Sequence, residues 1–237
     1  MIILDQLTVS YPGKKRVIDE LELSLPEHQI HGIVGLNGAG KTTLLNTIFG
    51  LKKKDSGIVT WNDQRISKQD ISFLPTENYF YSNITGREYL SLFKNQYFDE
   101  DQWNGLFILP LDTIIDKYST GMKKKLALMG VLKQDKPLMI LDEPFDRIDI
   151  ETGRIIRSIL LRLKDKGKTI LVTSHIIETL IDLCDSIHYI KEGKVQYSRD
   201  HSDFENFKKE IYEFIETRNE NKIDELIKRL PDQHNVP

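Results

Sequence analysis

The chain has 237 residues, with 33 lysines and arginines against 36 aspartates and glutamates, and a single cysteine. That length supports one large hydrophobic core, whereas the lone Cys184 excludes an internal disulfide and a cysteine-based metal cage. The net charge of −3 is unevenly placed, because residues 201–237 hold six basic and nine acidic side chains. The first 200 residues are therefore balanced and exert no general attraction on nucleic acid, so we expect no nucleic-acid partner.

Apolar segments are short throughout the chain. None approaches the roughly 20 consecutive apolar residues of a membrane-spanning helix, and the longest runs, such as Leu138–Leu141, have the length of a strand. The amino-terminal residues lack the basic start and the long apolar core of a signal peptide. These patterns predict a cytoplasmic protein that reaches a membrane only through a partner.

The first half of the chain begins with short β-rich runs separated by turns. Strands are predicted at Ile2–Leu4, Leu7–Ser10, Leu21–Leu25, Ile30–Val34, Gly57–Trp61 and Ile71–Leu74. A helix is predicted at Thr42–Phe49, with Gly50 as its stop signal. Residues 79–118 combine aromatic side chains with helical periodicity and resemble an inserted helical lobe.

The second half alternates helices with strands. Helices are predicted from Ser119 to about Lys133, at Glu151–Lys166 and Ile176–Cys184, and as one or two amphipathic helices over Phe204–Leu230. Strands are predicted at Leu138–Leu141 and Thr169–Ser174, followed by a hairpin of Ile187–Ile190 and Lys194–Tyr197 that turns at Glu192 and Gly193. Such alternation implies a mostly parallel sheet covered on both faces.

Residues Gly35–Thr42 read GLNGAGKT and fit the phosphate-loop pattern between a predicted strand and a predicted helix. Glycines let backbone N–H groups curl around phosphate oxygens, and the following helix directs its positive end at them. Lys41 is placed to reach the β- and γ-phosphates of a nucleotide, and the Thr42 hydroxyl to bind Mg²⁺. A chance match is expected roughly 0.01 times in a chain of this composition, so we interpret the loop as a nucleotide site.

The buried strand Leu138–Leu141 ends in two carboxylates, Asp142 and Glu143. Open α/β sheets bind ligands at the carboxyl ends of their strands. Asp142 can hold Mg²⁺ through water, and Glu143 is placed as a general base that orients the attacking water. Alone, this would be an ordinary strand exit. Downstream of a phosphate loop it indicates nucleotide hydrolysis.

The stretch Tyr118–Lys125, YSTGMKKK, discriminates among nucleotide-binding families. It resembles the signature sequence of ATP-binding-cassette (ABC) ATPases, and the resemblance covers the chain from about residue 2 to 200. It implies an α/β fold with a P-loop NTPase (RecA-like) core, a mostly parallel sheet, an antiparallel β subdomain and an inserted helical subdomain at about 79–133. The cassette would occupy residues 1–200, and residues 201–237 would form an amphipathic helical tail.

The resemblance also implies which residues bind and hydrolyse ATP. Glu143 and His175, which looks like the switch histidine at the γ-phosphate, are the expected catalytic residues. Mg²⁺ would be held by Thr42, Asp142 and Thr76. The residues expected to contact ATP, with the signature segment contributed by a second subunit, are Tyr11, Asn37, Gly38, Ala39, Gly40, Lys41, Thr42, Thr43, Ser119, Gly121 and Asp149.

Taken singly, several of these residues have an ordinary structural interpretation: Ser119 is a good helix N-cap, and Tyr11 would more often be a packing tyrosine. The chain also departs from the family pattern. Thr76 stands where the family has a glutamine that helps to bind Mg²⁺ and water and senses the transmembrane partner, and threonine is too short to make the same reach. The remaining departures are Thr120 for the first signature glycine and Phe145, Asp146 and Arg147 for the small residues before Asp149.

As a whole, the resemblance implies the ATP-hydrolysing subunit of an ABC transporter. It would act at the inner face of the cell membrane with a separate transmembrane permease and a second ABC ATPase subunit. The run Gly121–Leu128 is similar to the branch that exports antibiotics, bacteriocins and other amphiphilic peptides. The alternatives are a soluble ABC ATPase of DNA repair or ribosomes, and a regulatory nucleotide-binding module with weak catalysis.

Three basic clusters lie within the cassette, at Lys14–Arg16, Lys52–Lys54 and Lys123–Lys125. They could touch anionic lipid headgroups. A run of like charge is, however, usually a solvated face of the protein, and we favour that interpretation for all three.

Overall fold

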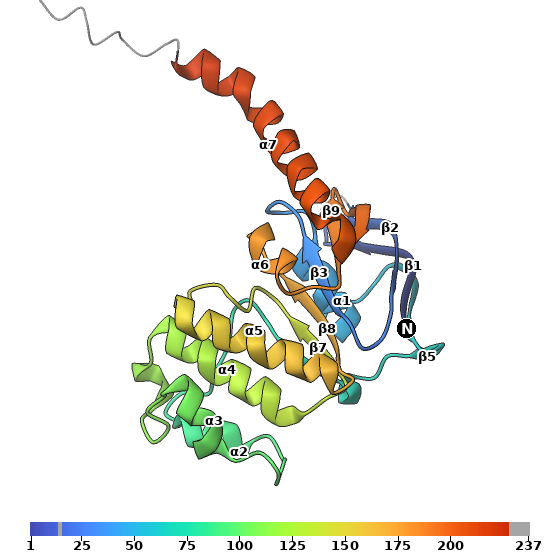
Figure 1. Ribbon diagram of the computed structural model, residues 1–237. Helices are drawn as coiled ribbons and strands as arrows, with labels where there is room; N and C mark the ends of the chain where they lie inside the picture. The colour runs from blue at the N-terminus through green and yellow to red at the C-terminus, as the bar shows by residue number, and fades with distance from the viewer. Residues whose placement is uncertain (14–15, 228–237) are drawn as a thin grey trace, which may run out of the picture.

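Two β-sheets and a group of helices make up the computed structural model, which describes residues 1–13 and 16–227 (Figure 1). The strands are β1 (Ile2–Ser10), β2 (Arg16–Leu25), β3 (Ile30–Val34), β4 (Ser56–Trp61), β5 (Gln64–Arg65), β6 (Ile71–Leu74), β7 (Leu138–Leu141), β8 (Thr169–Thr173), β9 (Ser186–Lys191) and β10 (Lys194–Asp200). The helices are α1 (Lys41–Phe49), α2 (Gly86–Ser91), α3 (Glu100–Phe107), α4 (Thr120–Gln134), α5 (Ile150–Asp165), α6 (Ile177–Ile181) and α7 (Phe204–Ile227). Short 3-10 turns lie at Lys68–Asp70, Ile115–Lys117 and His201–Asp203.

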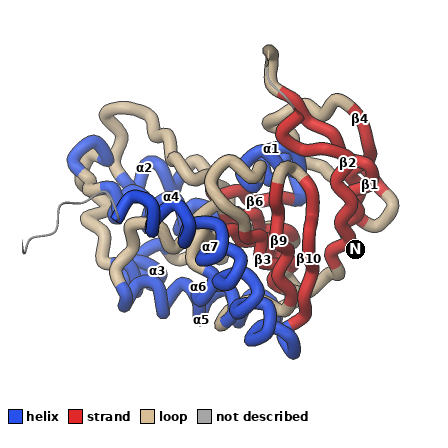
Figure 2. The backbone as a smooth tube through the Cα atoms, turned by 90° about the horizontal axis from the view of Figure 1, so that it is seen from above, coloured by secondary structure: helices blue, strands red, loops and turns tan. Residues whose placement is uncertain are grey.

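The larger sheet has six strands in the order β10-β9-β3-β8-β7-β6. Its strands β9, β3, β8, β7 and β6 run parallel, and only β10 is antiparallel, to β9. The smaller sheet is antiparallel, in the order β2-β1-β4-β5. Figure 2 shows α2, α3, α4 and α5 on one side of the larger sheet and the smaller sheet with its strands β1, β2 and β4 on the other. The predicted α/β fold with a mostly parallel sheet is confirmed.

The central strands are buried on both faces because each is a short run of apolar residues. In β7, Met139 and Leu141 pack with the helices, whereas Leu138 and Ile140 pack with α1 and the smaller sheet. Two hydrophobic cores therefore clamp the larger sheet from opposite sides. Packing on both faces holds each central strand in place and thereby fixes the position of the residue that follows the strand.

The strand register brings several chain segments to one edge of the larger sheet. Leu74 at the end of β6 lies beside Leu141 of β7, and Leu141 lies beside Val172 of β8. On the other side of β8, Ile33 of β3 lies beside Thr173. The segments that follow these four strands consequently meet at the carboxyl edge of the sheet.

Most predicted elements match the structure; the short strand β5 was not predicted, and the other differences lie at element boundaries. The predicted runs Ile2–Leu4 and Leu7–Ser10 form the single strand β1, because Gln6 takes a positive φ of 48° and makes a bulge rather than a turn. Helix α6 is shorter than predicted, because the N–H groups of Leu183 and Cys184 both turn back to the Leu180 carbonyl. The hairpin is confirmed, with φ of 51° and 77° at Glu192 and Gly193.

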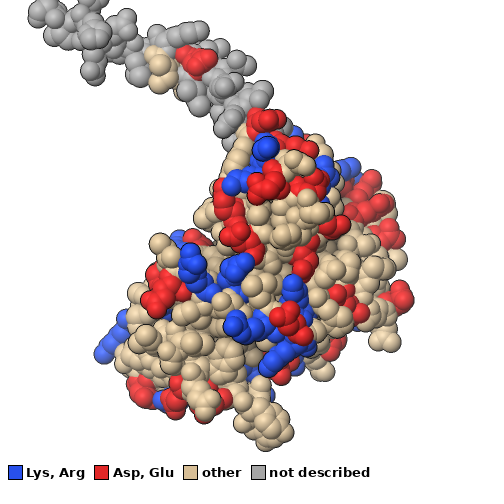
Figure 3. All heavy atoms as spheres, in the orientation of Figure 1, with Lys and Arg blue, Asp and Glu red and all other residues tan. Residues whose placement is uncertain are grey.

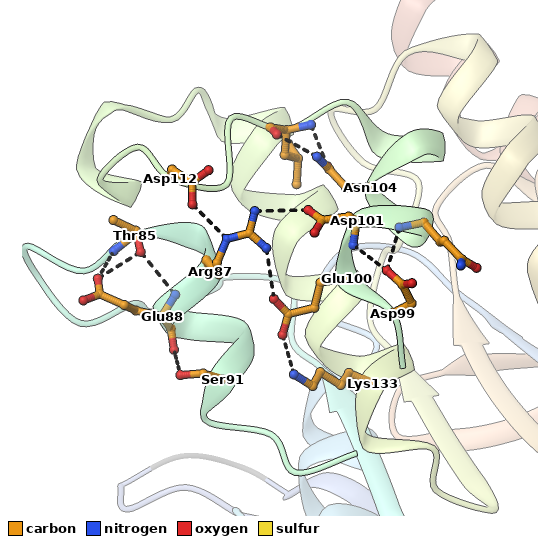
Figure 4. A network of polar contacts seen from close by, with 12 residues as sticks. Thr85, Arg87, Glu88, Ser91, Asp99, Glu100, Asp101, Asn104, Asp112 and Lys133 are labelled. Atoms are coloured by element: carbon orange, nitrogen blue, oxygen red, sulfur yellow. Dashed lines mark hydrogen bonds and ion pairs between the residues drawn. The ribbon is translucent and has the colours of Figure 1, made fainter. Parts of the chain in front are cut away.

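A polar network holds the helices of the lobe together (Figure 4). Arg87 on α2 contacts Asp112, Asp101 and Glu100, and Glu100 on α3 also pairs with Lys133 on α4. Helix α2 begins with a capping box in which the Thr85 and Glu88 side chains and main chains bind each other. One arginine thus links three neighbouring segments of the lobe.

The predicted tail helix is observed as the single helix α7, although residues 228–230 of the prediction lie outside the described residues. Its first turns bury Phe204, Phe207 and Ile211 against the core, and Figure 1 shows the rest of the helix extending away from the sheets. On the face drawn in Figure 3, basic side chains gather over α5. Within residues 1–13 and 16–227, no helix combines the length and apolar character needed to span a membrane.

Candidate functional site

The loop between β3 and α1 has the backbone form that its glycines permit. Gly38 and Gly40 have φ values of 81° and 107°, in the left-handed region that other residues rarely adopt. A Cβ atom on Gly40 would lie 2.8 Å from Ile18 Cδ1 and 2.9 Å from Val17 O. Gly40 is therefore required by both conformation and space. A cavity of about 1040 Å³ borders the loop at Gly38.

Lys41 is the first residue of α1, and its side chain turns back into the loop. Its ammonium donates hydrogen bonds to the carbonyl oxygens of Gly35 at 2.7 Å and Leu36 at 3.4 Å. Burial lowers the pKa of Lys41, while the nearby Glu143 and Asp142 raise it. The Lys41 ammonium is thus a largely desolvated cation that interacts with the carboxylates of Glu143 and Asp142. Such a cation interacts strongly with phosphate oxygens.

Asp142 follows β7 and is almost wholly buried, with 1% of its surface exposed. Its Oδ1 accepts a hydrogen bond from Thr173 Oγ1 at 2.6 Å, and its Oδ2 accepts one from Thr76 Oγ1 at 2.7 Å. The three residues follow or end the neighbouring strands β6, β7 and β8. Thr76 therefore reaches the acidic strand end in spite of its short side chain.

Glu143 and His175 meet at the same edge. His175 Nδ1 lies 2.9 Å from Glu143 Oε2, and the His175 backbone N–H donates to the same oxygen at 3.2 Å. The Glu143 backbone N–H donates to Thr173 Oγ1 at 2.8 Å. Glu143 has a φ of 51°, a strained conformation for a residue with a side chain. Strain of this kind is held in place by its surroundings and is concentrated at functional sites.

The residues expected around the base and the phosphates include Tyr11 and two threonines of α1. Tyr11 exposes 37% of its surface, and its hydroxyl lies 3.4 Å from Thr43 Oγ1. The Lys52 ammonium lies 3.9 Å from the centre of the Tyr11 ring, so one ring face already has a cation partner. Thr43 is buried, whereas Thr42 is exposed.

The signature segment and Asp149 have clear structural roles within the chain. Ser119 caps α4 by accepting a hydrogen bond from Met122 N at 3.2 Å. Asp149 caps α5 by accepting from both the N–H and the hydroxyl of Thr152, and Lys125 lies 3.2 Å from its Oδ2. These bonds hold the pKa of Asp149 well below its usual range. Their predicted contacts with ATP remain predictions.

Gly121, the retained signature glycine, lies directly against the loop that precedes α5. A Cβ atom at this position would lie 3.1 Å from the carbonyl oxygen of Arg147. That spacing is tighter than an ordinary contact, so a larger residue would push the two segments apart. The glycine thus allows the start of α4 to approach the loop that leads to Asp149.

The interpretation of the third basic cluster as a solvated face is wrong for Lys124. This lysine is 5% exposed, because α4 packs its side chain between the helix and the larger sheet. Lys125 pairs with Asp149, as described above. In the first cluster, Lys14 and Lys15 lie outside the described residues.

Thr173 was not predicted as a residue of the site. Its hydroxyl donates to Asp142 and accepts from the Glu143 N–H, which makes it the centre of the buried network. The available signal was a polar residue at the end of an apolar strand, two positions before His175.

The oxygen donors at the centre suit a hard divalent cation. Asp142 and Thr76 bring a carboxylate and a hydroxyl into contact, and oxygen ligands are the type that Mg²⁺ prefers. Thr42 is exposed in the first turn of α1, and the predicted bond of its hydroxyl to the cation stays a prediction. Each Asp142 oxygen accepts one hydroxyl hydrogen bond, although a carboxylate offers about four lone-pair sites. Acceptor capacity therefore remains for a cation or for its bound water.

The chain was compared with known proteins. The family model described as ABC transporter matches residues 18–146. An uncharacterized ABC transporter ATP-binding protein of Methanocaldococcus jannaschii is 32% identical over 209 residues, which cover 84% of this chain and 77% of that protein. The lantibiotic transport ATP-binding protein SrtF of Streptococcus pyogenes is 27% identical over 219 residues, which cover 87% of this chain and 93% of SrtF.

Solved structures show the same fold. A dimeric ATP-binding cassette in a post-hydrolysis state, bound to ADP and Pi, matches with a TM-score of 0.75 at 22% identity. The match covers 85% of this chain and 99% of the other.

Proposed function

The chain belongs to the ABC transporter family as an ATP-binding and ATP-hydrolysing subunit, and from this premise we propose that it powers export of an amphiphilic peptide or antibiotic through a separate permease. One observation supports the assignment of its ATP-hydrolysing site. Lys41, Asp142, Glu143 and His175 come from three distant parts of the chain and meet at one edge of the sheet.

In the proposed reaction, the phosphate loop binds the phosphates of ATP and Lys41 turns from its carbonyl partners towards them. The backbone N–H groups of Asn37, Gly38, Ala39 and Gly40 would surround the phosphate oxygens. Thr42, Asp142 and Thr76 would hold Mg²⁺, which neutralises charge on the phosphate oxygens when it is bound. Tyr11 would stack on the base, and Thr43 would support the loop from beneath.

Glu143 would accept the proton of the attacking water. Its side chain is 15% exposed, so the carboxylate faces a largely desolvated space that a water molecule can still reach. His175 holds Glu143 Oε2 through its backbone N–H and its ring. Since the His175 side chain is 53% exposed, its other ring nitrogen is free to turn towards a γ-phosphate.

The second half of the ATP site would come from a partner subunit. Ser119 and Thr120 are exposed at the start of α4, a helix of 15 residues whose first N–H groups attract anions. We propose that Ser119 and Gly121 of one subunit close over the ATP held by the other, with Asp149 in the crossing loop. The cassette would occupy residues 1–200, with the helical lobe at 79–133 and the tail at 201–237.

The direction of transport is proposed from two observations. The lantibiotic transport relative aligns over nearly its whole length, and the run Gly121–Leu128 is similar to the signature region of peptide exporters. The permease would hold this subunit at the inner face of the membrane.

The variant Glu143→Gln tests the catalytic assignment. It preserves the size and hydrogen-bonding capacity of the side chain but removes the proton acceptor. We expect ATP binding to persist, steady-state hydrolysis to fall by at least about 100-fold, and an ATP-bound dimer to accumulate in gel filtration. Hydrolysis at the normal rate by this variant would remove Glu143 from the proposed role.

Export is tested in cells that lack the chromosomal copy of this chain. Complementation with the natural chain should restore growth in the presence of a cationic amphiphilic peptide, and complementation with Glu143→Gln should not. Equal sensitivity of all strains across a panel of such peptides would contradict the proposed substrate class. It would leave the ATPase assignment standing.

A further inference from the structure

Helix α4 carries two buried lysines with different kinds of partner. Lys124 and Lys133 are 5% and 6% exposed, although lysine is almost never buried without compensation. Lys133 pairs with the carboxylate of Glu100 in the helical lobe (Figure 4). The two hydrogen-bond acceptors of Lys124 are main-chain carbonyl oxygens instead. The difference calls for a separate explanation of Lys124.

The carbonyl partners of Lys124 belong to the proposed active site. Its Nζ lies 3.3 Å from Asp142 O and 3.4 Å from Thr76 O. Asp142 and Thr76 follow the neighbouring strands β7 and β6, and their side chains hydrogen-bond each other at 2.7 Å. A single ammonium thus bridges the main chains of the two segments, whose side chains are already joined by a hydrogen bond.

The electrostatic surroundings explain how the charge is tolerated. Burial lowers the pKa of Lys124, and Arg147 acts in the same direction. The acidic side chains of Asp142, Asp146 and Glu143 raise it. A buried ammonium is costly unless it gains both hydrogen bonds and nearby negative charge. Here the negative charge is supplied by the residues that carry the chemistry.

We propose that Lys124 is a positioning residue of the ATPase site. Its ammonium holds the Thr76 segment against the end of β7, and thereby keeps the Thr76 hydroxyl on Asp142. Because Lys124 lies only five residues after the helix cap Ser119, it also ties the start of α4 to both strand ends. The inference rests on the proposed function, since it assigns Lys124 a role at the centre formed by Asp142 and Glu143.

If Lys124 has this role, its loss should affect catalysis more than ATP binding. The hydrogen bonds of Lys124 go to Asp142 and Thr76, whereas the loop cation Lys41 bonds to Gly35 and Leu36. Loss of the Lys124 ammonium should therefore disturb the hydrolytic centre more than the phosphate loop. We expect Lys124→Met to lower kcat roughly 10-fold, with a change in the KM for ATP of less than about twofold.

The contact between the ends of β6 and β7 can be measured directly in the protein without nucleotide, metal or turnover. The Asp142 N–H donates to Leu74 O at 2.8 Å, so the join between the ends of β6 and β7 is visible in amide hydrogen exchange. In the nucleotide-free protein, Lys124→Met should accelerate exchange in residues 74–78 and 142–146. Lys124→Arg keeps the charge and can reach two acceptors, so it should restore slow exchange and most of kcat.

The matched control is Lys133→Met, which removes a lysine of equal burial from the same helix. It should leave exchange at residues 74–78 and 142–146 unchanged, with kcat within about twofold of the natural chain. Identical exchange and kcat in the two methionine variants would overturn the proposal, as would a folded Lys124→Arg protein that exchanges as fast and turns over as slowly as Lys124→Met. If Glu143→Gln retained hydrolysis while exchange behaved as predicted, the catalytic assignment would fail and the positioning contact would stand.

Discussion

Two polar clusters lie at opposite ends of the strands of the six-stranded sheet. The amino-end cluster consists of His31 and Ser186 near the starts of β3 and β9, with His188 and Ser198 beside them. The carboxyl-end cluster consists of Asp142, Glu143, Thr173 and His175, where β7 and β8 end. Both combine histidine side chains with hydroxyl groups. They differ in how completely their hydrogen bonds are satisfied.

The amino-end cluster is a closed chain of hydrogen bonds. The Pro26 carbonyl can only accept, so His31 Nε2 must donate to it, at 2.7 Å. His31 Nδ1 then accepts from Ser186, whose oxygen accepts from His188 Nε2, and His188 Nδ1 accepts from Ser198. Both imidazoles are neutral with the proton on Nε2. Each ring nitrogen has a partner inside the protein, so nothing remains to bind a ligand.

The carboxyl-end cluster retains unused capacity. Asp142 accepts two hydroxyl hydrogen bonds, fewer than its oxygens can take, and His175 is about half exposed. The backbone of Glu143 is strained, which the other cluster does not show at His31 or His188. The two clusters therefore differ in two ways: the hydrogen-bonding groups of the amino-end cluster are saturated inside the protein, whereas the carboxyl-end cluster keeps unused acceptor capacity and is open to solvent at His175.

Thr173→Val would break the carboxyl-end cluster most severely. Valine keeps the shape of threonine but removes the hydroxyl, leaving the buried Asp142 Oδ1 and the partly buried Glu143 N–H without that partner. Unsatisfied buried groups cost about 1–3 kcal/mol each, more when charged. We expect the free energy of unfolding, measured with urea, to fall by about 2–4 kcal/mol and kcat to fall with it.

Thr173→Ser supplies the control for this variant. It retains the hydroxyl and loses only a methyl group, so it should recover most of both quantities. A Thr173→Val protein with natural stability and kcat would mean that the carboxyl-end network tolerates an orphaned carboxylate. The hydrogen bonds of the carboxyl-end cluster would then contribute little to stability or catalysis, and the proposed difference between the clusters would not hold.

Acid should weaken the amino-end cluster through its histidines. Burial, with a smaller contribution from His31, lowers the pKa of His188 to about 3, and burial also lowers the pKa of His31. The unfolded chain takes up these protons near pH 6.5 whereas the native chain does not. This stabilisation is therefore complete above about pH 6.5 and is lost as pH falls, by about 2 kcal/mol from His188 alone at pH 5.

Urea unfolding at pH 7.5, 6 and 5 measures that slope. His188→Gln removes one titrating group and should flatten the dependence between pH 6.5 and 5, whatever its effect on stability at pH 7.5. An unchanged slope would show that His188 titrates normally in the native protein. The cluster would then be less isolated from water than its geometry indicates.

The contrast between the clusters also shows what the sequence can predict. Strands β6 and β7 match their predicted bounds, because each is a short, mostly apolar run of a parallel sheet whose ends are marked by polar residues or proline in the sequence. The Asp142-Glu143 pair could be placed for the same reason, as it directly follows such a run.

Contacts between distant segments could not be predicted. His31 and Ser186 are joined only by the pairing of β3 with β9, which no local pattern reveals. Lys124 sits in a run of three lysines that has the pattern of a solvated face, and only the packing of α4 on the larger sheet makes it a buried residue. Saturation of hydrogen bonds is likewise a property of the packed structure.

Ser198→Ala makes the smallest change and tests whether the clusters are independent. Ser198 is an exposed residue of β10 at the outer end of the hydrogen-bonded chain, so water can replace its hydroxyl on His188 Nδ1. We expect a loss of about 0.5–1 kcal/mol in the free energy of unfolding and an unchanged kcat. The kcat measurement is the sharper of the two, because β9 pairs with β3 and β3 leads directly into the phosphate loop. A drop in kcat would mean that a disturbance of the amino-end cluster travels along β3 to Lys41, and that the two clusters act as one unit of the sheet.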